Sequence, residues 1–321
     1  MKLLVTGGAG FIGSQFVRNE ILSDKKFSEV YVLDCLTYAG NLNNLRDVKG
    51  NSKFKFILGD IKDSQVVNEL VAEADFIINF AAESHVDKSI MDSTPFVQNN
   101  ILGTQVLLDA LRRSPKATFI QISTDEVYGT IDLGEWDENC ALLPNSPYAA
   151  SKAAADLLVL SYYHTYKLNL IITRSCNNFG PYQLTEKLIP LAITNLLKGK
   201  KVPIYGDGKN IREWIYVSDN CKYISELTER GRSGQIYNIG SGFRINNLDL
   251  IKMILEIMQK EENCIEYVQD RLGHDFRYSL NSDKTINLLG NRYESDFRNM
   301  LIGTVKWYQE NPEIWDQKSK I

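Results

Sequence analysis

An α/β fold built on a doubly wound parallel sheet is predicted by three features of this 321-residue sequence. In the first half, short apolar runs alternate with longer helical segments, as they do where helices connect parallel strands. The apolar runs lack polar alternation, which indicates strands with both faces covered. A glycine-rich turn separates the first run from the first helical segment. After about residue 175 turn-rich stretches become frequent, and a smaller C-terminal lobe is predicted there.

Each predicted strand is a short run rich in valine, isoleucine or phenylalanine, which are residues that suit a buried sheet. Turn-forming or polar residues follow each run. The expected strands cover residues 2–6, 29–34, 53–60, 74–82, 117–123 and 169–175.

The predicted helices are longer segments in which apolar side chains recur at helical spacing. In the first of them Phe11, Ile12, Phe16, Val17 and Leu22 fall near one side. Further helices are expected over residues 95–113, 146–166, 184–200 and 247–260.

The change of pattern near residue 175 divides the chain into two expected parts. Residues 1–175 contain the glycine-rich turn and are the expected cofactor-binding domain, to which a segment around residues 213–240 is expected to return. Residues 176–321 are the expected substrate-binding lobe.

The composition argues against several classes of protein. A net charge of −4 without long basic runs disfavours a nucleic-acid partner. No segment has the ~20 apolar residues of a membrane helix, and the apolar N-terminal run is too short for a signal peptide. Five cysteines without CxxC spacing and three histidines without HExxH spacing argue against a bound metal. Reduced thiols and a cytoplasmic location are therefore expected.

The glycine-rich turn has the spacing of a dinucleotide site. Gly7, Gly10 and Gly13 follow the first strand and open the first helix. Glycines there allow a tight turn and let a pyrophosphate approach backbone N–H groups at a helix N-terminus. A plain turn with close packing is the alternative, but the position after the first strand favours a Rossmann-type cofactor site.

Two aspartates end the next two strands. A carboxylate at Asp34 suits ribose hydroxyls and repels a 2′-phosphate, so NAD is favoured over NADP. Asp60 stands where an adenine edge would lie. Both aspartates have a simpler explanation, because this residue also caps turns and helices.

Tyr148 and Lys152 lie one helical turn apart in the segment YAASK. A nearby ammonium group lowers the pKa of a phenol, and Tyr148 can then act as a base toward a sugar hydroxyl while a hydride leaves the same carbon. Since YxxxK spacing is common, a solvated pair is the alternative.

Two adjacent carboxylates, Asp125 and Glu126, follow an apolar strand in the segment STDEVYG. The end of a buried strand is a costly place for negative charge. The pair is either a solvated acidic turn or two groups placed for proton transfer, and proximity of like charges would keep one of them protonated.

These features resemble the extended short-chain dehydrogenase/reductase family over nearly the whole chain. Longer stretches resemble the dTDP-glucose 4,6-dehydratase family within it. They are LTYAGN (36–41), AAESHVDKSI (81–90), STDEVYG (123–129), SPYAASK (146–152), NNFGPYQ (177–183), EKLIPL (186–191), GDGKNIREWIYV (206–217) and RLGHD (271–275).

The resemblance implies a Rossmann-type fold, tightly held NAD, a nucleotide-sugar substrate and a homodimer. In such a dimer the helix near 95–113 and the helix that carries Tyr148 form a four-helix contact. The alternative for these apolar helices is burial inside the monomer.

The resemblance also implies a role for each reactive group. Tyr148 takes the proton of the C4 hydroxyl while NAD takes the C4 hydride, with Thr124 holding that oxygen and Lys152 tuning Tyr148. Glu126 removes the C5 proton and Asp125 protonates the departing C6 hydroxyl. The expected reaction is the dehydration of dTDP-glucose to dTDP-4-keto-6-deoxyglucose by a hydro-lyase, with the hydride returned to C6.

The resemblance implies two further residue sets. The NAD-binding residues are Gly7, Gly10, Phe11, Ile12, Gly13, Asp34, Thr37, Gly40, Asp60, Ile61, Phe80, Ala81, Ala82, Ser84, Asn99, Tyr148, Lys152 and Asn178. The substrate-binding residues are Ser84, Thr124, Asn177, Lys187, Leu188, Pro203, Tyr205, Arg212, Asn247, Arg271 and His274.

Some positions depart from the family pattern. Arg244 stands where Glu is expected, and Phe179 replaces a common Tyr. Since such departures leave the choice of base open, UDP-glucose is an alternative substrate. A UDP-sugar 4-epimerase or decarboxylase and a non-catalytic NAD-binding regulator are the rival functions. The acidic pair argues against the first two, and the set of Thr124, Tyr148 and Lys152 argues against the third.

Overall fold

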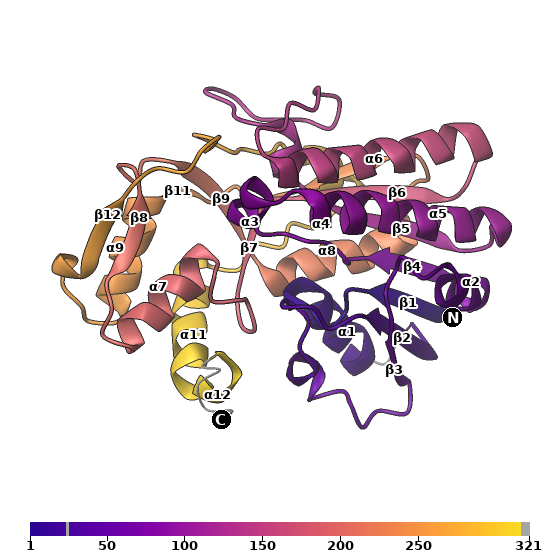
Figure 1. The fold of residues 1–321 in the computed structure, drawn as a ribbon, viewed down its shortest axis with the longest axis horizontal. Coiled ribbons are helices and arrows are strands. Elements are labelled where there is room, and N and C mark those ends of the chain that lie inside the picture. Colours follow the sequence, from indigo (N-terminus) through magenta and orange to yellow (C-terminus); the bar gives the residue numbers. More distant parts are fainter. Residues whose placement is uncertain (24–25, 316–321) are drawn as a thin grey trace.

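The computed structural model describes residues 1–23 and 26–315. Its larger layer is a seven-stranded parallel sheet with the order β10-β6-β5-β4-β1-β2-β3 (Figure 1). The predicted doubly wound sheet is thus confirmed. The strands span β1 Lys2–Thr6, β2 Glu29–Asp34, β3 Phe54–Leu58, β4 Phe76–Asn79, β5 Thr118–Thr124, β6 Leu170–Ser175 and β10 Ile236–Ile239.

The two faces of this sheet belong to two separate cores. Leu3 and Val5 of β1 point into one core, whereas Leu4 between them points into the other, which is the two-residue period of a strand. Both cores are apolar and fully buried, so the sequence shows no polar alternation.

Helices cover both faces of the sheet. On the side of Leu3 and Val5 lie α1 (Phe11–Ser23), α8 (Val217–Arg230) and α10 (Asp283–Leu289), with the short 3₁₀ turn η1 (Leu42–Leu45). On the other side lie α2 (Ser64–Glu73), α5 (Gly103–Arg113) and α6 (Pro147–Tyr166). Figure 1 shows α5 and α6 running together along this face.

The helix predicted at 95–113 exists, but it is not one regular α-helix. It consists of α4 (Thr94–Phe96), a π-helical turn η2 (Val97–Leu102) and α5. The wider π turn cannot be distinguished from an α-helix by apolar spacing over so few residues. A short helix α3 (Val86–Met91) precedes this segment.

The smaller lobe has two small sheets, with strand orders β11-β9-β7 and β12-β8. Its core packs Phe179, Ile193, Trp214, Ile254 and Leu301 together. Its elements are β7 Asn177–Phe179, α7 Leu188–Leu197, β8 Val202–Tyr205, β9 Ile211–Tyr216, β11 Arg244–Asn246, α9 Asn247–Ile257, η4 Glu262–Cys264, β12 Ile265–Val268, α11 Phe297–Glu310 and α12 Pro312–Trp315.

The chain crosses between the two layers more than once. After β9 in the small sheet, α8 packs against α1, and β10 pairs with β6 at the edge of the large sheet. The direction of winding reverses between β1 and β4, and ligands of doubly wound sheets bind beyond the strand ends at such a point. Within the described ranges, no helix has the length and apolarity needed to span a bilayer.

Candidate active site

A cavity of about 290 Å³ lies beyond the carboxyl ends of β1, β2, β4 and β5. Every residue predicted to bind NAD lines it, and so do Thr124, Asp125 and Glu126. Segments from the second half of the chain, including Asn177 and Lys187, close its other side.

The glycine turn packs closely against the protein's own backbone. Gly7 has φ of +68°, and a Cβ there would lie 2.5 Å from the backbone nitrogen of Ala81. A Cβ on Gly13 would lie 2.4 Å from the carbonyl oxygen of Gly7. Only glycine therefore fits at these two positions, and both line the cavity beside the N-terminus of α1, where a pyrophosphate would bind. The residues present fit a dinucleotide.

Asp34 and Asp60 line this cavity and also hold turns. Asp34 accepts hydrogen bonds from the backbone nitrogens of Ala9 (2.9 Å) and Leu36 (2.8 Å). Burial raises the pKa of Asp34, and these two bonds oppose the rise. Asp60 accepts from the backbone nitrogen of Lys62 at 2.9 Å. Each carboxylate thus stabilises a turn, which was the simpler explanation for these aspartates. Both residues also line the cavity.

The acidic pair lies on a single 3₁₀ turn, η3 (Asp125–Tyr128), directly after β5. Thr124 caps this turn, because its hydroxyl accepts from the backbone nitrogen of Glu126 at 3.3 Å. The same hydroxyl donates to Asp125 Oδ1 at 3.1 Å. Asp125 is 2% exposed and its Oδ2 has no hydrogen-bond partner, so the pair is not a solvated acidic turn.

The pKa of each acid is raised, but to different degrees. The pKa of Asp125 is well above its ordinary value, chiefly because of burial and secondarily because of Glu126. The like-charged neighbour thus raises the Asp125 pKa as expected, although removal from water contributes more. Burial also raises the pKa of Glu126, but Lys187, Arg212 and Arg271 oppose that rise.

Tyr148 and Lys152 are presented by the first turns of α6. Ser146 caps this helix by accepting from the backbone nitrogen of Ala149 at 3.1 Å, and Pro147 occupies the first turn. Both reactive side chains are buried. Lys152 Nζ donates to the carbonyl oxygen of Ile122 at 2.6 Å, and burial lowers its pKa to about 8.

The expected lowering of the Tyr148 pKa is wrong. Burial raises this pKa well above its ordinary value, and the carboxylates of Glu126 and Asp125 raise it further. A hydrogen bond with Thr124 acts in the opposite direction. The removal of the phenol from water therefore raises its pKa more than the expected effect of the Lys152 ammonium group would lower it.

Three cations from separate segments act on Glu126. Lys187 Nζ donates to the carbonyl oxygen of Ser84 at 2.6 Å, and burial lowers the pKa of Lys187. Arg212 donates to the carbonyl oxygen of Asp275 at 2.8 Å. Arg271 pairs with Asp87 at 2.6 Å. Backbone carbonyl oxygens thus hold Lys187 and Arg212 in place, and a carboxylate holds Arg271.

The predicted substrate residues divide into two groups. Ser84, Thr124, Asn177 and Lys187 line the cavity. The structure does not bring the others to the cavity wall, because they belong to the small lobe beyond it. These are Leu188, Pro203, Tyr205, Arg212, Asn247, Arg271 and His274.

Part of the second group forms a cluster of its own. The Arg271 guanidinium lies 5.1 Å from the ring centre of Tyr205, whose hydroxyl donates to Asp87 at 3.4 Å. His274 packs edge-on to the Tyr205 ring. An aromatic face with cations around it suits a nucleotide base and its phosphates. Asn247 begins α9, and its side-chain oxygen is buried without a partner.

Gln183 was not predicted from the sequence, although it lines the cavity. Its Nε2 donates to the carbonyl oxygen of Asn178 at 2.9 Å, and its Oε1 is buried without a partner. The available signal was its position at the end of NNFGPYQ, the stretch that also carries Asn177 and Asn178. Glu83, Ser123 and Cys176 line the cavity as well and were also missed.

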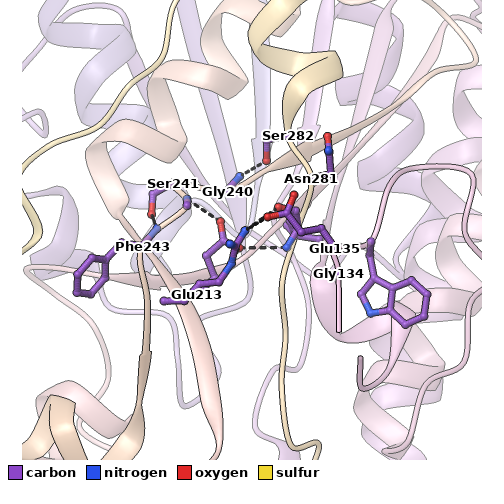
Figure 2. A network of polar contacts seen from close by, with 12 residues as sticks. Gly134, Glu135, Glu213, Gly240, Ser241, Phe243, Asn281 and Ser282 are labelled. Carbon is purple, nitrogen blue, oxygen red and sulfur yellow. Dashed lines mark hydrogen bonds and ion pairs between the residues drawn. The ribbon is translucent and has the colours of Figure 1, made fainter. Parts of the chain in front are cut away.

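Arg244, which departs from the family pattern, belongs to a buried polar network around Glu213. Its Nε lies 3.1 Å from the fully buried Glu213, and its NH2 lies 2.7 Å from Glu135. Glu213 also accepts from the backbone nitrogens of Gly242 (2.9 Å) and Leu280 (3.0 Å). Figure 2 shows Glu213 and Glu135 converging at the centre of this network, so the arginine balances two carboxylates.

The other departure, Phe179, lies in an apolar setting. Its ring packs against those of Trp214, Tyr216 and Phe297, with centroids 4.9 to 6.4 Å away. Phe179 is 1% exposed and does not line the cavity.

Comparison with known proteins gives consistent matches over nearly the full length. Residues 4–303 match the family described as GDP-mannose 4,6 dehydratase. A dTDP-glucose 4,6-dehydratase from Actinoplanes sp. is 48% identical over 98% of this chain and 100% of its own. The low-salt glycan biosynthesis protein Agl12 of Haloferax volcanii is 50% identical over 98% of this chain and 100% of its own.

A solved structure agrees with these matches. DesIV, a dTDP-glucose 4,6-dehydratase from Streptomyces venezuelae solved with NAD bound, superimposes with a TM-score of 0.97 at 47% identity. The alignment covers 98% of this chain and 99% of the DesIV chain.

Proposed function

This chain belongs to the family described as GDP-mannose 4,6 dehydratase, and we propose that it is an NAD-dependent hydro-lyase that converts dTDP-glucose to dTDP-4-keto-6-deoxyglucose. Full-length similarity to dTDP-glucose 4,6-dehydratases supports this substrate. The observation that carries the proposal is the adjacent pair of the buried Asp125 and the partly buried Glu126, which lines the same cavity as Tyr148. A 4-epimerase or a decarboxylase needs no such pair.

The glycine turn, Asp34 and the residues that line the cavity beside β4 would hold NAD. Bound NAD would supply a hydride acceptor for C4 of the hexose and return that hydride to C6. Asp34 excludes a 2′-phosphate by charge, which favours NAD over NADP.

Tyr148 is the base for the C4 hydroxyl in this proposal. Its high pKa means that the phenol is protonated until a positive charge is placed beside it. Thr124 orients the same oxygen through its hydroxyl. Lys152, with a pKa of about 8, can change its charge near neutral pH and adjust the electrostatics of the site.

The two carboxyl groups divide the elimination between them. Asp125 is the acid, because burial raises its pKa and so favours the protonated form that donates to the departing C6 hydroxyl. Glu126 is the base for the C5 proton, because three cations favour its ionised form. This is the pattern in which two neighbouring acids have different environments and therefore different roles.

The nucleotide end of the substrate lies against the small lobe in this proposal. Lys187, Arg212 and Arg271 supply donors for the diphosphate, and Tyr205 supplies a face for the base. Ser84 and Asn177 contact the hexose. Leu188, Pro203, Asn247 and His274 complete the proposed contacts.

The proposed assembly is a homodimer that pairs α6 and the η2–α5 segment with their copies. These adjacent helices expose Val97 (51%), Leu102 (44%) and Leu157 (57%). Leu157→Lys is expected to shift the protein to monomers in analytical ultracentrifugation. Ile302→Lys, at an exposed position of α11, is the control and should leave the dimer intact. A monomeric unmodified protein contradicts this assembly.

We propose the same two-part organisation as the sequence suggested, with residues 1–175 and the returning segment around 213–240 binding NAD and residues 176–321 binding the nucleotide sugar. Limited proteolysis with and without each ligand tests it. A cytoplasmic location is supported by five free cysteines. Cell fractionation tests that location.

The activity is tested by incubating the protein separately with dTDP-glucose and UDP-glucose in the presence of NAD. We expect the 4-keto-6-deoxy product, followed by its absorbance in alkali, mainly from dTDP-glucose. A higher kcat/KM with UDP-glucose would overturn the choice of base. A 4-epimer as the product from either sugar would overturn the dehydratase assignment.

A further inference from the structure

A buried ion pair connects α6 to strand β6 of the large sheet. Arg174 on β6 is 2% exposed and Asp156 on α6 is fully buried. Arg174 Nε donates to Asp156 Oδ2 at 2.9 Å. Asp156 is two helical turns beyond Tyr148 and one beyond Lys152, so the pair lies on the face of α6 that carries the reactive side chains.

The same guanidinium reaches the turn that carries the acidic pair. Arg174 NH1 donates to the hydroxyl of Tyr128 at 2.8 Å, and that hydroxyl donates to Asn238 Oδ1 at 2.9 Å. Tyr128 is the last residue of η3, two positions after Glu126. Its ring lies 4.7 Å from the guanidinium carbon and stacks on Trp136. Arg174 therefore joins α6 and η3 through one planar group.

The turn η3 needs such a tie because it is short. It has four residues, and 3₁₀ hydrogen bonds give such a turn little stability of its own. Gly129 ends it with φ of +79°. Thr124 fixes its start by accepting a hydrogen bond from the backbone nitrogen of Glu126, and Arg174 of β6 fixes its end by donating to the Tyr128 hydroxyl.

We propose that Tyr128 and Arg174 are positioning residues that fix the proton-transfer pair Asp125–Glu126 relative to the redox pair Tyr148–Lys152. The proposal rests on the dehydratase function given above. The two pairs belong to different elements, and both must reach one hexose ring. An error of about 1 Å in such alignment can slow a chemical step about 100-fold.

The test is Tyr128→Phe, which keeps the ring between Arg174 and Trp136 and removes the hydroxyl. Hydrogen–deuterium exchange, measured on the protein without substrate, should rise several-fold in the segment 125–129. With dTDP-glucose and NAD, elimination should slow about 10-fold while the first reduction of bound NAD changes less than about twofold, so that reduced cofactor accumulates.

Tyr237→Phe is the matched control. Tyr237 is a buried tyrosine of β10 whose hydroxyl accepts from the backbone nitrogen of Arg232 at 2.9 Å. This variant should change neither the exchange of 125–129 nor the ratio of the two steps. Unchanged exchange in Tyr128→Phe would overturn the proposal, and so would an equal slowing of both steps. If the unmodified protein dehydrates no sugar, the dehydratase function fails, and the exchange measurement still decides whether Tyr128 holds the turn.

Discussion

Lys152 Nζ lies 2.6 Å from the carbonyl oxygen of Ile122, so the amine of α6 hydrogen-bonds to the backbone of β5. The carbonyl stabilises an ammonium group that burial would otherwise make very costly. Asp156 also favours its charged form, but burial is the larger effect and lowers the pKa to about 8. Lys152 is therefore a buried cation that can change its charge near physiological pH.

The first prediction concerns stability against pH. In the unfolded chain Lys152 binds its proton up to about pH 10.5, whereas in the folded chain it loses the proton near pH 8. Between these values the unfolded state binds more protons, so the free energy of unfolding rises with pH. We expect the stability advantage of Lys152→Met over the unmodified protein to shrink by about 2 kcal/mol between about pH 7.5 and pH 9.5. Urea unfolding at several pH values measures this, and a constant difference contradicts the low pKa.

The second prediction separates oxidation from elimination. Asp125→Asn combined with Glu126→Gln removes both proton-transfer groups and keeps the shapes of the side chains. We expect this double variant to reduce bound NAD when sugar is added, while product formation falls at least ~100-fold. Absorbance of the reduced nicotinamide and the alkali assay follow the two steps. Normal product formation would overturn the roles given to both acids.

The third prediction concerns two helical glycines with opposite environments. A Cβ on Gly13 would lie 2.4 Å from the Gly7 carbonyl oxygen, whereas a Cβ on Gly303 of α11 meets nothing within 4 Å. Gly13→Ala should lower the free energy of unfolding by about 1–3 kcal/mol and abolish NAD binding. Gly303→Ala should raise the free energy of unfolding by about 0.5–1 kcal/mol, because alanine favours the helix. Urea unfolding measures the stability of each variant, and titration with NAD measures its cofactor affinity. Equal changes in stability for the two variants would contradict the close packing at Gly13.

Much of the large sheet was predictable because its signals are local. The run at residues 2–6 corresponds to β1 without error, and the glycine turn follows where the pattern required it. The acidic pair and the Tyr148–Lys152 pair were also visible, since each lies within one short segment. Their electrostatics were not, because burial depends on the whole fold. Tyr148 is the clearest example, because Lys152 was expected to lower its pKa and burial raises it instead.

Contacts between distant segments could not be obtained from local pattern. The three cations that act on Glu126 come from positions 187, 212 and 271, and only the family resemblance selected them. Gln183 sits in an irregular turn with no periodicity to mark it. The acceptor for Lys152 is a backbone carbonyl, which carries no signal in the side-chain sequence.

The last prediction concerns the Arg244–Glu213 pair. Removing the guanidinium in Arg244→Met leaves the fully buried Glu213 with backbone donors alone, and we expect a loss of about 3–5 kcal/mol in the free energy of unfolding. Adding Glu213→Gln removes the uncompensated charge and should restore at least about 2 kcal/mol of that loss. The control is Lys209→Ala, which breaks an exposed pair with Asp207 and should change stability by less than about 1 kcal/mol. Urea unfolding of the unmodified protein, Arg244→Met, Glu213→Gln and the double variant gives the coupling energy. Strictly additive losses would mean that Arg244 does not compensate the charge of Glu213.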